Sequence, residues 1–509
     1  MPVLPRNKDK YRLAFEKPDL NYLIDENTLP MRLYKLIGQL DFKEFYDKCS
    51  TVGAPSYPPE DMLSVIMLAL SEGVFSSREI EKKCKRDIYY MFLTEQRNPD
   101  HATIARFIQR FGKEISSLGA QIIQLSREQK IATFDTIAID GTKIASVSSK
   151  KHSMRSEQLN RHLKYLRSRV SKTIVRIQQT DKKESKEIYR LERERKNLEL
   201  KISNAEEAKK ELEKRKELIK DKEHRKNHQI NIEEPDARMM QPISTNGYNA
   251  QISVDTKSGI IVTHDVVVSR SDNQEFAGQC QKSEAVLGKD KNRIYVADSG
   301  YISENTFRYI KESKINGYIN DSREKEEPET IEELLAKNKR LTPYDFRYDK
   351  KQNNIICPNQ KYLEEIRKDI YECRECEDCP LIELCCPGKR KNKRVTRTNY
   401  TCLREEMSEK VKGNKEIMSQ RKAVERSFAQ MKWNLGMTRF SRKGLTGAGL
   451  ELCLMVLSMN MVKIITILHI LMNTKRRIKK ILVSWIESAK NQIKGEYFEN
   501  VLISPNKIF

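Results

Sequence analysis

The chain has 509 residues, more than one hydrophobic core usually supports, so roughly two to four domains are expected. Lys and Arg outnumber Asp and Glu by 95 to 72, giving a formal charge of +23. Such a charge favours polyanionic partners, nucleic acid first, because binding releases condensed counterions. A lysine-rich composition with no binding role is the alternative. Two basic clusters, at residues 389–397 and 475–480, are candidate phosphate contacts.

Secretion, membrane insertion and a disulfide scaffold are not indicated. The N-terminus carries basic residues without an apolar segment, so a secretory signal is not expected. The apolar stretch 450–472 is interrupted by charged and polar residues, and it falls short of the roughly 18 uncharged residues that a membrane span needs. Eleven cysteines in a chain of this length suit a reducing compartment. We therefore expect a cytoplasmic protein with a buried helix at 450–472 and no membrane partner.

Residues 31 to about 130 are expected to be helical, because apolar residues recur at three- and four-residue spacing. Helix starts are predicted after 58–59, 76–77 and 99–100, where Pro, Ser or Asp residues stand. Short helices joined by tight turns are typical of a helix-turn-helix DNA module, but a helical bundle that only braces the rest fits as well. Residues 1–130 are thus a helical domain and a candidate DNA-binding domain.

The periodicity changes at residue 136, where an apolar run predicts a buried strand that ends at the acid Asp140. Residues 131–155 would begin a catalytic core. Residues 156–226 follow as a charged segment without Pro or Gly, and their 3.5-residue apolar repeat shifts register near 178–185. Two antiparallel helices in a coiled-coil insertion are predicted, with one long helix and a stutter as the alternative. This arm would contact a partner, grip DNA or serve as a spacer.

The core is expected to continue over residues 227–320, where strand patterns resume. Apolar and alternating runs at 248–254 and 260–268 flank turn residues at 257–259. This arrangement predicts a β-hairpin.

A second buried strand, over 293–297, is predicted to end at another acid, Asp298. A polar helix near 273–287 precedes it, and a helix over 303–313 and a strand over 315–319 follow. With the arm set aside, the order of elements is β-β-β-α-β-α-β, which indicates an α/β fold.

The remaining chain divides into three segments. Residues 321–410 form a Cys-rich basic insertion, 411–474 return to the core, and 475–509 form a basic tail. Within 411–474, a helix over 420–431 carries Glu425.

Three carboxylates can account for a phosphoryl-transfer site. Asp140 and Asp298 would lie side by side at the ends of neighbouring strands, where like charges repel unless a cation intervenes. Two Mg²⁺ ions about 4 Å apart take oxygen ligands and can activate water for an in-line phosphoryl displacement. Glu425 is the third candidate, with Arg421 and Lys432 one and two helical turns away to hold phosphates. Strand-end solvation and a plain surface position are the alternatives.

Three short stretches carry these acids. They are Ile139-Asp140-Gly141-Thr142-Lys143, Val296-Ala297-Asp298-Ser299-Gly300-Tyr301 and Arg421-Lys422-Ala423-Val424-Glu425-Arg426-Ser427-Phe428. They resemble the three acidic motifs of DDE transposases from bacterial insertion sequences. Arg421, Glu425 and Lys432 reproduce the spacing of that family's Tyr-Arg-Glu-Lys signature, whereas the Tyr of the signature falls on Met418. Stretches at 76–81, 99–107, 236–251 and 436–445 also resemble the family, so the resemblance covers most of the chain.

The resemblance implies a ribonuclease-H-like mixed sheet and a DNA transposase. It implies two Mg²⁺ ions, replaceable by Mn²⁺, held by Asp140, Asp298 and Glu425. Water would cleave at the transposon ends, and the freed 3′ hydroxyl would attack target DNA. Arg421, Lys432 and Lys143 would contact DNA, and the enzyme would act as a homo-oligomer on it. Met418 in place of Tyr puts the activity of this chain in doubt.

The Cys-rich segment suggests a second metal. Its cysteines are Cys373, Cys376, Cys379 and Cys385, with Cys386 adjacent and Cys357 upstream. Two close pairs suit a structural zinc, whereas the spacing departs from that of a ferredoxin. No histidine lies between residues 265 and 468, and reduced thiols without metal are the alternative. Related transposases carry a similar insert, which would shape DNA contacts without a catalytic part.

Other functions remain open. A metal-dependent nuclease that cuts without joining would use the same acids. A catalytically inactive DNA-binding relative would keep the basic clusters and lose the chemistry. A purely structural coiled-coil protein is the weakest alternative, because the heptads occupy only about 70 of the 509 residues.

Overall fold

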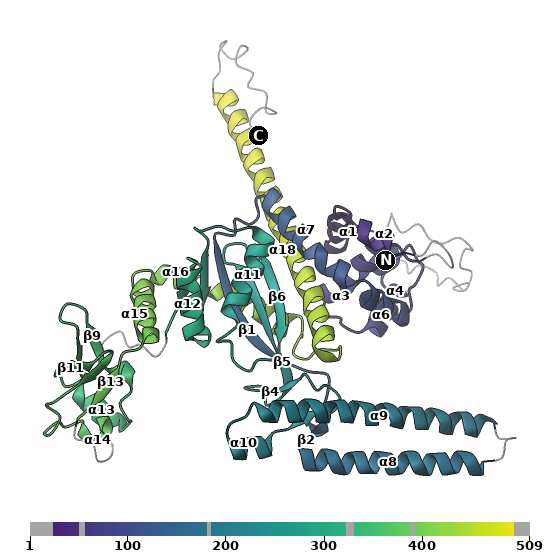
Figure 1. Ribbon diagram of the computed structural model, residues 1–509. Coiled ribbons are helices and arrows are strands. Elements are labelled where there is room, and N and C mark those ends of the chain that lie inside the picture. The colour runs from purple at the N-terminus through teal and green to yellow at the C-terminus, as the bar shows by residue number, and fades with distance from the viewer. Residues whose placement is uncertain (1–23, 50–55, 181–184, 322–329, 387–391, 493–509) are drawn as a thin grey trace, which may run out of the picture.

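The computed structural model describes residues 24–49, 56–180, 185–321, 330–386 and 392–492. A central mixed sheet is flanked by the N-terminal helices and by a long C-terminal helix, and two units project from it (Figure 1). The projections are a helical arm and a small all-antiparallel sheet with cysteines. The α/β class expected from the sequence is confirmed.

Within residues 24–49 and 56–130, the N-terminal region contains seven helices. They are α1 (Leu29–Ile37), α2 (Lys43–Asp47), α3 (Pro59–Ser71), α4 (Ser77–Cys84), α5 (Ile88–Leu93), α6 (His101–Arg110) and α7 (Gly112–Glu128). The helices predicted after 58–59, 76–77 and 99–100 are confirmed as α3, α4 and α6. Asp100 caps α6 by accepting from the backbone N–H of Thr103, whereas Ser76 before α4 makes no side-chain cap bond. α3 contributes most to the core, because it packs against α1, α5 and the C-terminal helix.

The central sheet contains six strands. They are β1 (Thr136–Ala145), β4 (Arg238–Met240), β5 (Thr245–Asp255), β6 (Ile261–Val267), β7 (Ile294–Ala297) and β8 (Asn316–Ile319). β1 lies between β5 and β7, β8 lies beyond β7, and both β4 and β6 pair with the far edge of β5. β7 and β8 run parallel to β1, and β5 runs antiparallel to it. The hairpin of β5 and β6 and the strands at 293–297 and 315–319 are confirmed.

One strand differs from its prediction. β1 continues past Asp140 to Ala145, because Asp140 to Ala145 pair with β5 from Ile252 to Gly247. The sequence predicted an end at Asp140 since the apolar run stops there. What ends at this point is the pairing with the parallel neighbour, whose last pair is Ile139 with Ala297.

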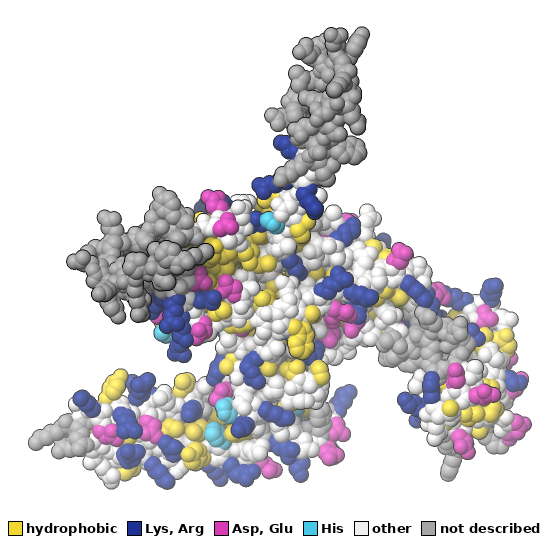
Figure 2. All heavy atoms as spheres, turned by 180° about the vertical axis from the view of Figure 1, so that it is seen from behind, with side chains coloured by type: hydrophobic (Ala, Val, Ile, Leu, Met, Phe, Trp, Pro, Cys, Tyr) yellow, Lys and Arg dark blue, Asp and Glu magenta, His cyan; other side chains and the backbone are white. Residues whose placement is uncertain are grey.

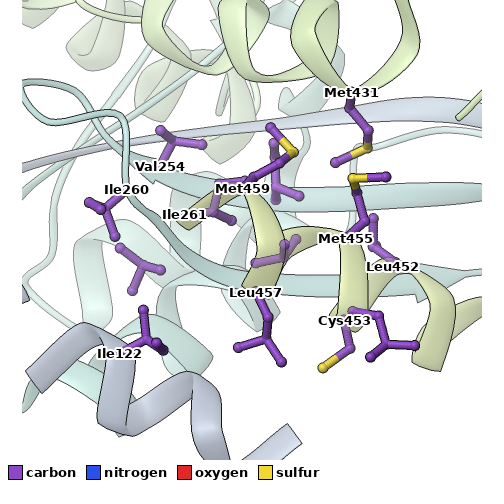
Figure 3. Close-up of a cluster of buried hydrophobic side chains, with 14 of the residues drawn as sticks. Ile122, Val254, Ile260, Ile261, Met431, Leu452, Cys453, Met455, Leu457 and Met459 are labelled. Carbon is purple, nitrogen blue, oxygen red and sulfur yellow. The ribbon is translucent and has the colours of Figure 1, made fainter. Parts of the chain in front are cut away.

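Helices cover both faces of the sheet. They are α11 (Phe276–Leu287), α12 (Glu304–Glu312), α15 (Asn399–Lys412), α16 (Lys415–Ser419), α17 (Lys422–Ala429) and α18 (Gly444–Gln492), and the 3₁₀ turn η3 (Ser299–Tyr301) follows β7. The helix predicted over 420–431 begins at Lys422 and passes into a π-helical turn, η5 (Gln430–Asn434). In the core, α18 places Leu457 on the side of Ile122 of α7 and Met459 beside Ile261 of β6 (Figure 3).

α18 has the length and composition of a membrane-spanning helix over Gly444–Arg477, and 56% of its most apolar window is buried inside the molecule. It packs against α3, α7 and β6. The Asn460 amide donates to the carbonyl of Ile261 at 2.8 Å and accepts from its N–H at 2.8 Å, which satisfies the free edge of β6. These contacts are those of a core helix, in agreement with most of the buried helix expected at 450–472, whereas Ile470, Leu471 and Met472 at its end are exposed.

The arm consists of α8 (Ser156–Gln179) and α9 (Ser185–Glu217), followed by α10 (Lys222–Asn227). The two long helices lie side by side in opposite directions (Figure 1), as pairs such as Arg167 with Glu206 and Arg176 with Glu187 require. Part of the predicted tip, residues 181–184, lies outside the described residues. At the base, the short strands β2 (Ser153–Met154) and β3 (Ile230–Asn231) pair after the 3₁₀ turn η2 (Lys150–His152).

The Cys-rich unit holds a five-stranded antiparallel sheet in the order β13-β12-β11-β10-β9. Its elements are α13 (Ile331–Lys337), η4 (Pro343–Asp345), β9 (Arg347–Asp349), β10 (Asn354–Ile356), β11 (Tyr362–Arg367), β12 (Ile370–Glu372), α14 (Ile382–Cys385) and β13 (Arg394–Thr396). Two small apolar clusters, around Leu363 and around Leu381, make up its interior. Cores of this size supply little stability to a small unit.

Candidate active site

Asp140 and Asp298 occupy matching positions on neighbouring parallel strands. Ile139 pairs with Ala297, so the next residue on each strand is an acid. Strands in a sheet lie about 4.8 Å apart, and side chains at paired positions point to the same face. The structure therefore brings the two predicted aspartates together, as the sequence indicated.

The electrostatics of the pair are unfavourable without a partner cation. Burial and then the charge of Asp298 raise the pKa of Asp140 to about 7, against the opposing effects of the Gly141 N–H and of Arg421. Asp140 Oδ1 accepts from the Gly141 backbone at 2.8 Å, and Asp298 Oδ1 accepts from the Gly300 backbone at 2.9 Å. A buried carboxyl that resists ionisation at neutral pH is characteristic of functional sites.

Glu425 lies next to this pair and is linked to it through Arg421. The Arg421 guanidinium is 2.5 Å from a Glu425 carboxylate oxygen and 3.9 Å from Asp140 Oδ2. α17 packs against β1 and β5, which carries its N-terminal residues to the acidic end of β7. Asp140 and Glu425 thus share one guanidinium, and Asp298 neighbours Asp140 on the next strand.

Lys432 and Lys143, the other predicted DNA contacts, have different contact partners from those of Arg421. Lys432 Nζ donates to Thr142 Oγ1 at 2.6 Å and to the Lys143 carbonyl at 3.0 Å, and burial lowers its pKa. Thr142 shares the sheet face of Asp140, because successive residues of a strand alternate between faces. Lys143 projects from the opposite face, where its ammonium contacts Asp272 at 3.0 Å and only 10% of its side chain is exposed. The structure does not bring Lys143 to the surface that carries Arg421.

A buried polar network lies behind β1, and the sequence reasoning missed it. Asp272 Oδ1 accepts from Asn249 at 2.7 Å and from Gln251 at 2.6 Å, in addition to Lys143. Asn249 and Gln251 are fully buried on β5. A Cβ at Gly141 would stand 2.0 Å from Gln251 Nε2, so this position requires glycine. The alternation of Asn249 and Gln251 within an otherwise apolar strand was the available signal.

The donor set at the site suits a hard cation, since carboxylate oxygens are the ligands that Mg²⁺ prefers. In the described ranges, no three His, Cys, Asp or Glu side chains are gathered closely enough to hold a metal ion as they stand. The positive charge between Asp140 and Glu425 is that of Arg421. Metal binding would therefore require Arg421 to move aside.

Six cysteines of the Cys-rich unit line one small cavity of about 20 Å³. They are Cys357, Cys373, Cys376, Cys379, Cys385 and Cys386. Burial raises the pKa of Cys357, although its thiol accepts from the Lys361 backbone at 3.2 Å, a contact that lowers the pKa. All six are free cysteines. The predicted quartet at 373, 376, 379 and 385 lines this cavity together with Cys357 and Cys386, although no three of the described cysteines are close enough to hold a metal ion as they stand. Residues 354–362 form the hairpin that carries Cys357 to the others.

The two basic clusters have different surroundings. Residues 387–391 lie outside the described residues. Beyond them, Arg394 pairs with Glu372 at 2.8 Å and Arg397 pairs with Glu405 at 2.6 Å, so these cations stabilise the unit itself. In the second cluster, at 475–480, the side chains of Lys475, Arg476, Arg477 and Lys479 are exposed on α18.

Two family matches agree with this arrangement. Residues 18–110 match the family described as "Transposase domain (DUF772)", and residues 349–465 match the family described as "Transposase DDE domain". The chain therefore carries a transposase domain near each end. These two matches are consistent with a DDE transposase of insertion sequences, the family that its acidic motifs resemble, and the DDE domain implies a ribonuclease-H-like fold for the mixed sheet. No curated protein and no solved structure matches the chain.

Some of the candidate site residues lie within the two matched ranges, and others lie outside them. Glu425, Arg421 and Lys432 lie within the DDE match, as do the cysteines. Asp140 and Asp298 lie outside both matches. Their assignment therefore depends on their strand positions and on the resemblance of their motifs.

Proposed function

We propose that this transposase cleaves DNA at transposon ends and joins the 3′ hydroxyl to target DNA, with Asp140, Asp298 and Glu425 as the metal-binding carboxylates. The observation that carries the proposal is the juxtaposition of Asp140 and Asp298 on parallel strands, with Glu425 linked to Asp140 through Arg421. Three neighbouring acids with one cation between two of them would carry excess negative charge when ionised, which a pair of divalent ions would neutralise.

The residues would act as follows. Mg²⁺, or Mn²⁺ in its place, would activate the attacking oxygen and stabilise the leaving oxygen when bound. Asp140 gives up its proton before it serves as a ligand, because a protonated carboxyl has lost most of its donor strength. Arg421 turns from the carboxylates to a DNA phosphate, which its planar guanidinium can bind through two hydrogen bonds. Lys432 supports this surface by holding β1 through Thr142 and the Lys143 carbonyl.

Cleavage and joining on DNA with the element's own terminal repeats test the proposal. Asp298→Asn should abolish Mg²⁺-dependent nicking and leave binding of the same DNA intact. Asp135→Asn, at an exposed acid just before β1, is the matched control and should keep both activities. Nicking by the Asp298→Asn variant would refute the site.

The products separate the alternative functions. Strand-transfer products joined to a second DNA support a transposase that cuts and joins. Nicks without joined products indicate a metal-dependent nuclease, and binding without either indicates an inactive relative. Sedimentation of the complex on end DNA tests the expected homo-oligomer, and the family context supports action in the cytoplasm.

We also propose that the cysteine cavity binds a structural zinc ion through Cys373, Cys376, Cys379 and Cys385, with Cys357 and Cys386 as competing ligands. The support is the convergence of six thiols within a unit that has a small apolar core. Purified protein should contain about one zinc per chain. Cys373→Ser should lose the metal and lower the melting temperature of the unit, whereas Cys402→Ser, outside the cavity, should do neither. Bound iron or a metal-free protein would refute zinc.

A further inference from the structure

The two helices of the arm differ in charge. α8 contains six Lys or Arg and a single Glu, for a net charge of +5 over 24 residues. α9 contains eleven Lys or Arg and nine Glu, for a net charge of +2 over 33 residues. The basic character of the arm is therefore concentrated on α8.

Half of the α8 cations are used to hold the hairpin together. Arg167 pairs with Glu206 at 2.7 Å, Arg169 pairs with Glu194, and Arg176 lies 3.7 Å from Glu187. The remaining three are Arg161, Lys164 and Lys172, which form no ion pair with the described part of the chain and are exposed to solvent. Their charges are available to an external partner.

These three cations share the outer face of α8. At about 100° per residue, Arg161, Lys164 and Lys172 fall within roughly 80° of one another, opposite the seam of Leu159, Leu163 and Leu166 that packs on α9. Between them stand Ser168 and the exposed ring of Tyr165. A row of cations with small polar residues and an aromatic ring fits a phosphate backbone.

The outer face of α9 lacks this character. Lys196, Lys210 and Lys214 point outward there, but exposed glutamates occupy the same face. These are Glu192, Glu199, Glu207 and Glu217. Alternating signs cancel the field beyond about 10 Å at ordinary ionic strength, so α9 attracts a polyanion weakly. In Figure 2, dark blue Lys and Arg side chains recur along the lower edge of the arm, on the side of α8.

We propose that the outer face of α8, with Arg161, Lys164 and Lys172, binds the phosphate backbone of duplex DNA without reading its sequence. The three cations span 11 residues, about 16 Å, which matches roughly five phosphate steps along one strand. α8 begins shortly after β1 ends at Ala145, so the arm emerges from the strand that carries Asp140. This inference rests on the proposed function, since it assumes DNA as the substrate.

The test compares two triple variants of the full chain that remove the same charge. The first is R161Q/K164Q/K172Q on α8, and the control is K196Q/K210Q/K214Q on α9. Binding of a 30-base-pair duplex is measured by fluorescence anisotropy in EDTA, across a series of salt concentrations. Each lost phosphate contact lowers the slope of log K against log salt by about 0.9. We expect the slope for the α8 variant to be smaller in magnitude by about 2 to 3 and its affinity to be at least about tenfold lower. We expect the slope for the control variant to change by less than about 1.

Several outcomes would overturn the inference. Equal slopes for the α8 variant and the wild type would show that the face does not contact DNA. Equal losses in both variants would show a dependence on net charge alone. A change of oligomeric state in the α8 variant with an unchanged slope would make the face a protein contact. Far-ultraviolet circular dichroism must match for all three proteins, and Glu substitutions at the same positions give a second series if Gln perturbs the helix. Failure of the wild type to bind any duplex would refute the proposed function instead.

Discussion

Replacement of Asp140 by Asn should stabilise the protein, and the gain should depend on pH. The folded state raises the pKa of Asp140 to about 7, from an ordinary value of 3.8, through burial and the neighbouring Asp298. Because the folded pKa is the higher one, the folded state keeps its proton longer than the unfolded state. Stability therefore falls as pH rises from about 3.8 to about 7 and stays low above that. Asn carries no charge and avoids this loss.

The magnitude follows from the shift. Three pKa units correspond to about 4 kcal/mol at pH 8 and about 1.5 kcal/mol at pH 5. The advantage of Asp140→Asn over the wild type should thus grow by about 2 to 3 kcal/mol between these pH values. The Asn side chain can still accept from the Gly141 N–H, so little is lost in exchange.

Differential scanning calorimetry of the metal-free protein at pH 5 and pH 8 measures this growth. The transition of the large core is the one to follow, because the molecule has several separate apolar clusters and does not unfold as one unit. Asp135→Asn is the control. Lys257 lowers the pKa of Asp135, so its neutralisation should slightly destabilise the protein. An Asp140→Asn variant that gains equally at both pH values, or gains nothing, would refute the reasoning.

Three further changes have defined outcomes. Arg421→Gln removes the cation shared by Asp140 and Glu425, so Mg²⁺ should bind several-fold more tightly without DNA, as measured by isothermal titration calorimetry. Unchanged or weaker Mg²⁺ binding would show that Arg421 is not a counter-cation that the metal displaces. Gly141→Ala forces a methyl group against the buried Gln251 and should lower the free energy of unfolding, measured by chemical denaturation, by at least about 2 kcal/mol. An unchanged free energy of unfolding would show that Gln251 and its partners can shift to make room for the methyl group. Asn460→Ala deprives the edge of β6 of two buried hydrogen bonds and should cost about 2 to 4 kcal/mol, with loss of amide protection at Ile261 as the local readout.

The sequence predicted elements best where local patterns define them. The hairpin of β5 and β6, the buried strand β7 and the cap of α6 lie within a few residues of their expected positions, because apolar runs and turn or capping residues mark their ends. The residues around Asp140 in the sequence did not predict that β1 extends beyond it. Its polar second half is a strand only because it pairs with β5, a contact about 110 residues away.

Residue types predicted the acids of the candidate site, its cations and four of the six cysteines that line the cavity, but not the role of Cys357 or of Asp272. Asp140 and Asp298 were identifiable because each follows an apolar run, and parallel pairing brings them together. Cys357 was set aside, since its distance of 16 residues from Cys373 hides the hairpin that joins them. Asp272 had no signal of its own, because it lies in a polar stretch between β6 and α11 and gains its role from buried residues on β5.

The pleat of β1 explains why neighbouring residues of one motif take different roles. Asp140 and Thr142 face α17, where Arg421 and Lys432 contact them, and Gly141 and Lys143 face the network of Asp272. A family motif read as a linear string assigns Lys143 to DNA together with its neighbours, but a strand sends alternate side chains to opposite sides. The ion pair of Lys143 with Asp272 then stabilises β1 on the face opposite Asp140, and it does not occupy the face that carries the acids. Loss of this pair should therefore act on the position of Asp140 and not on DNA affinity. Lys143→Met should lower the cleavage rate while the dissociation constant for end DNA stays within about twofold, and a parallel loss of binding would return Lys143 to the DNA surface.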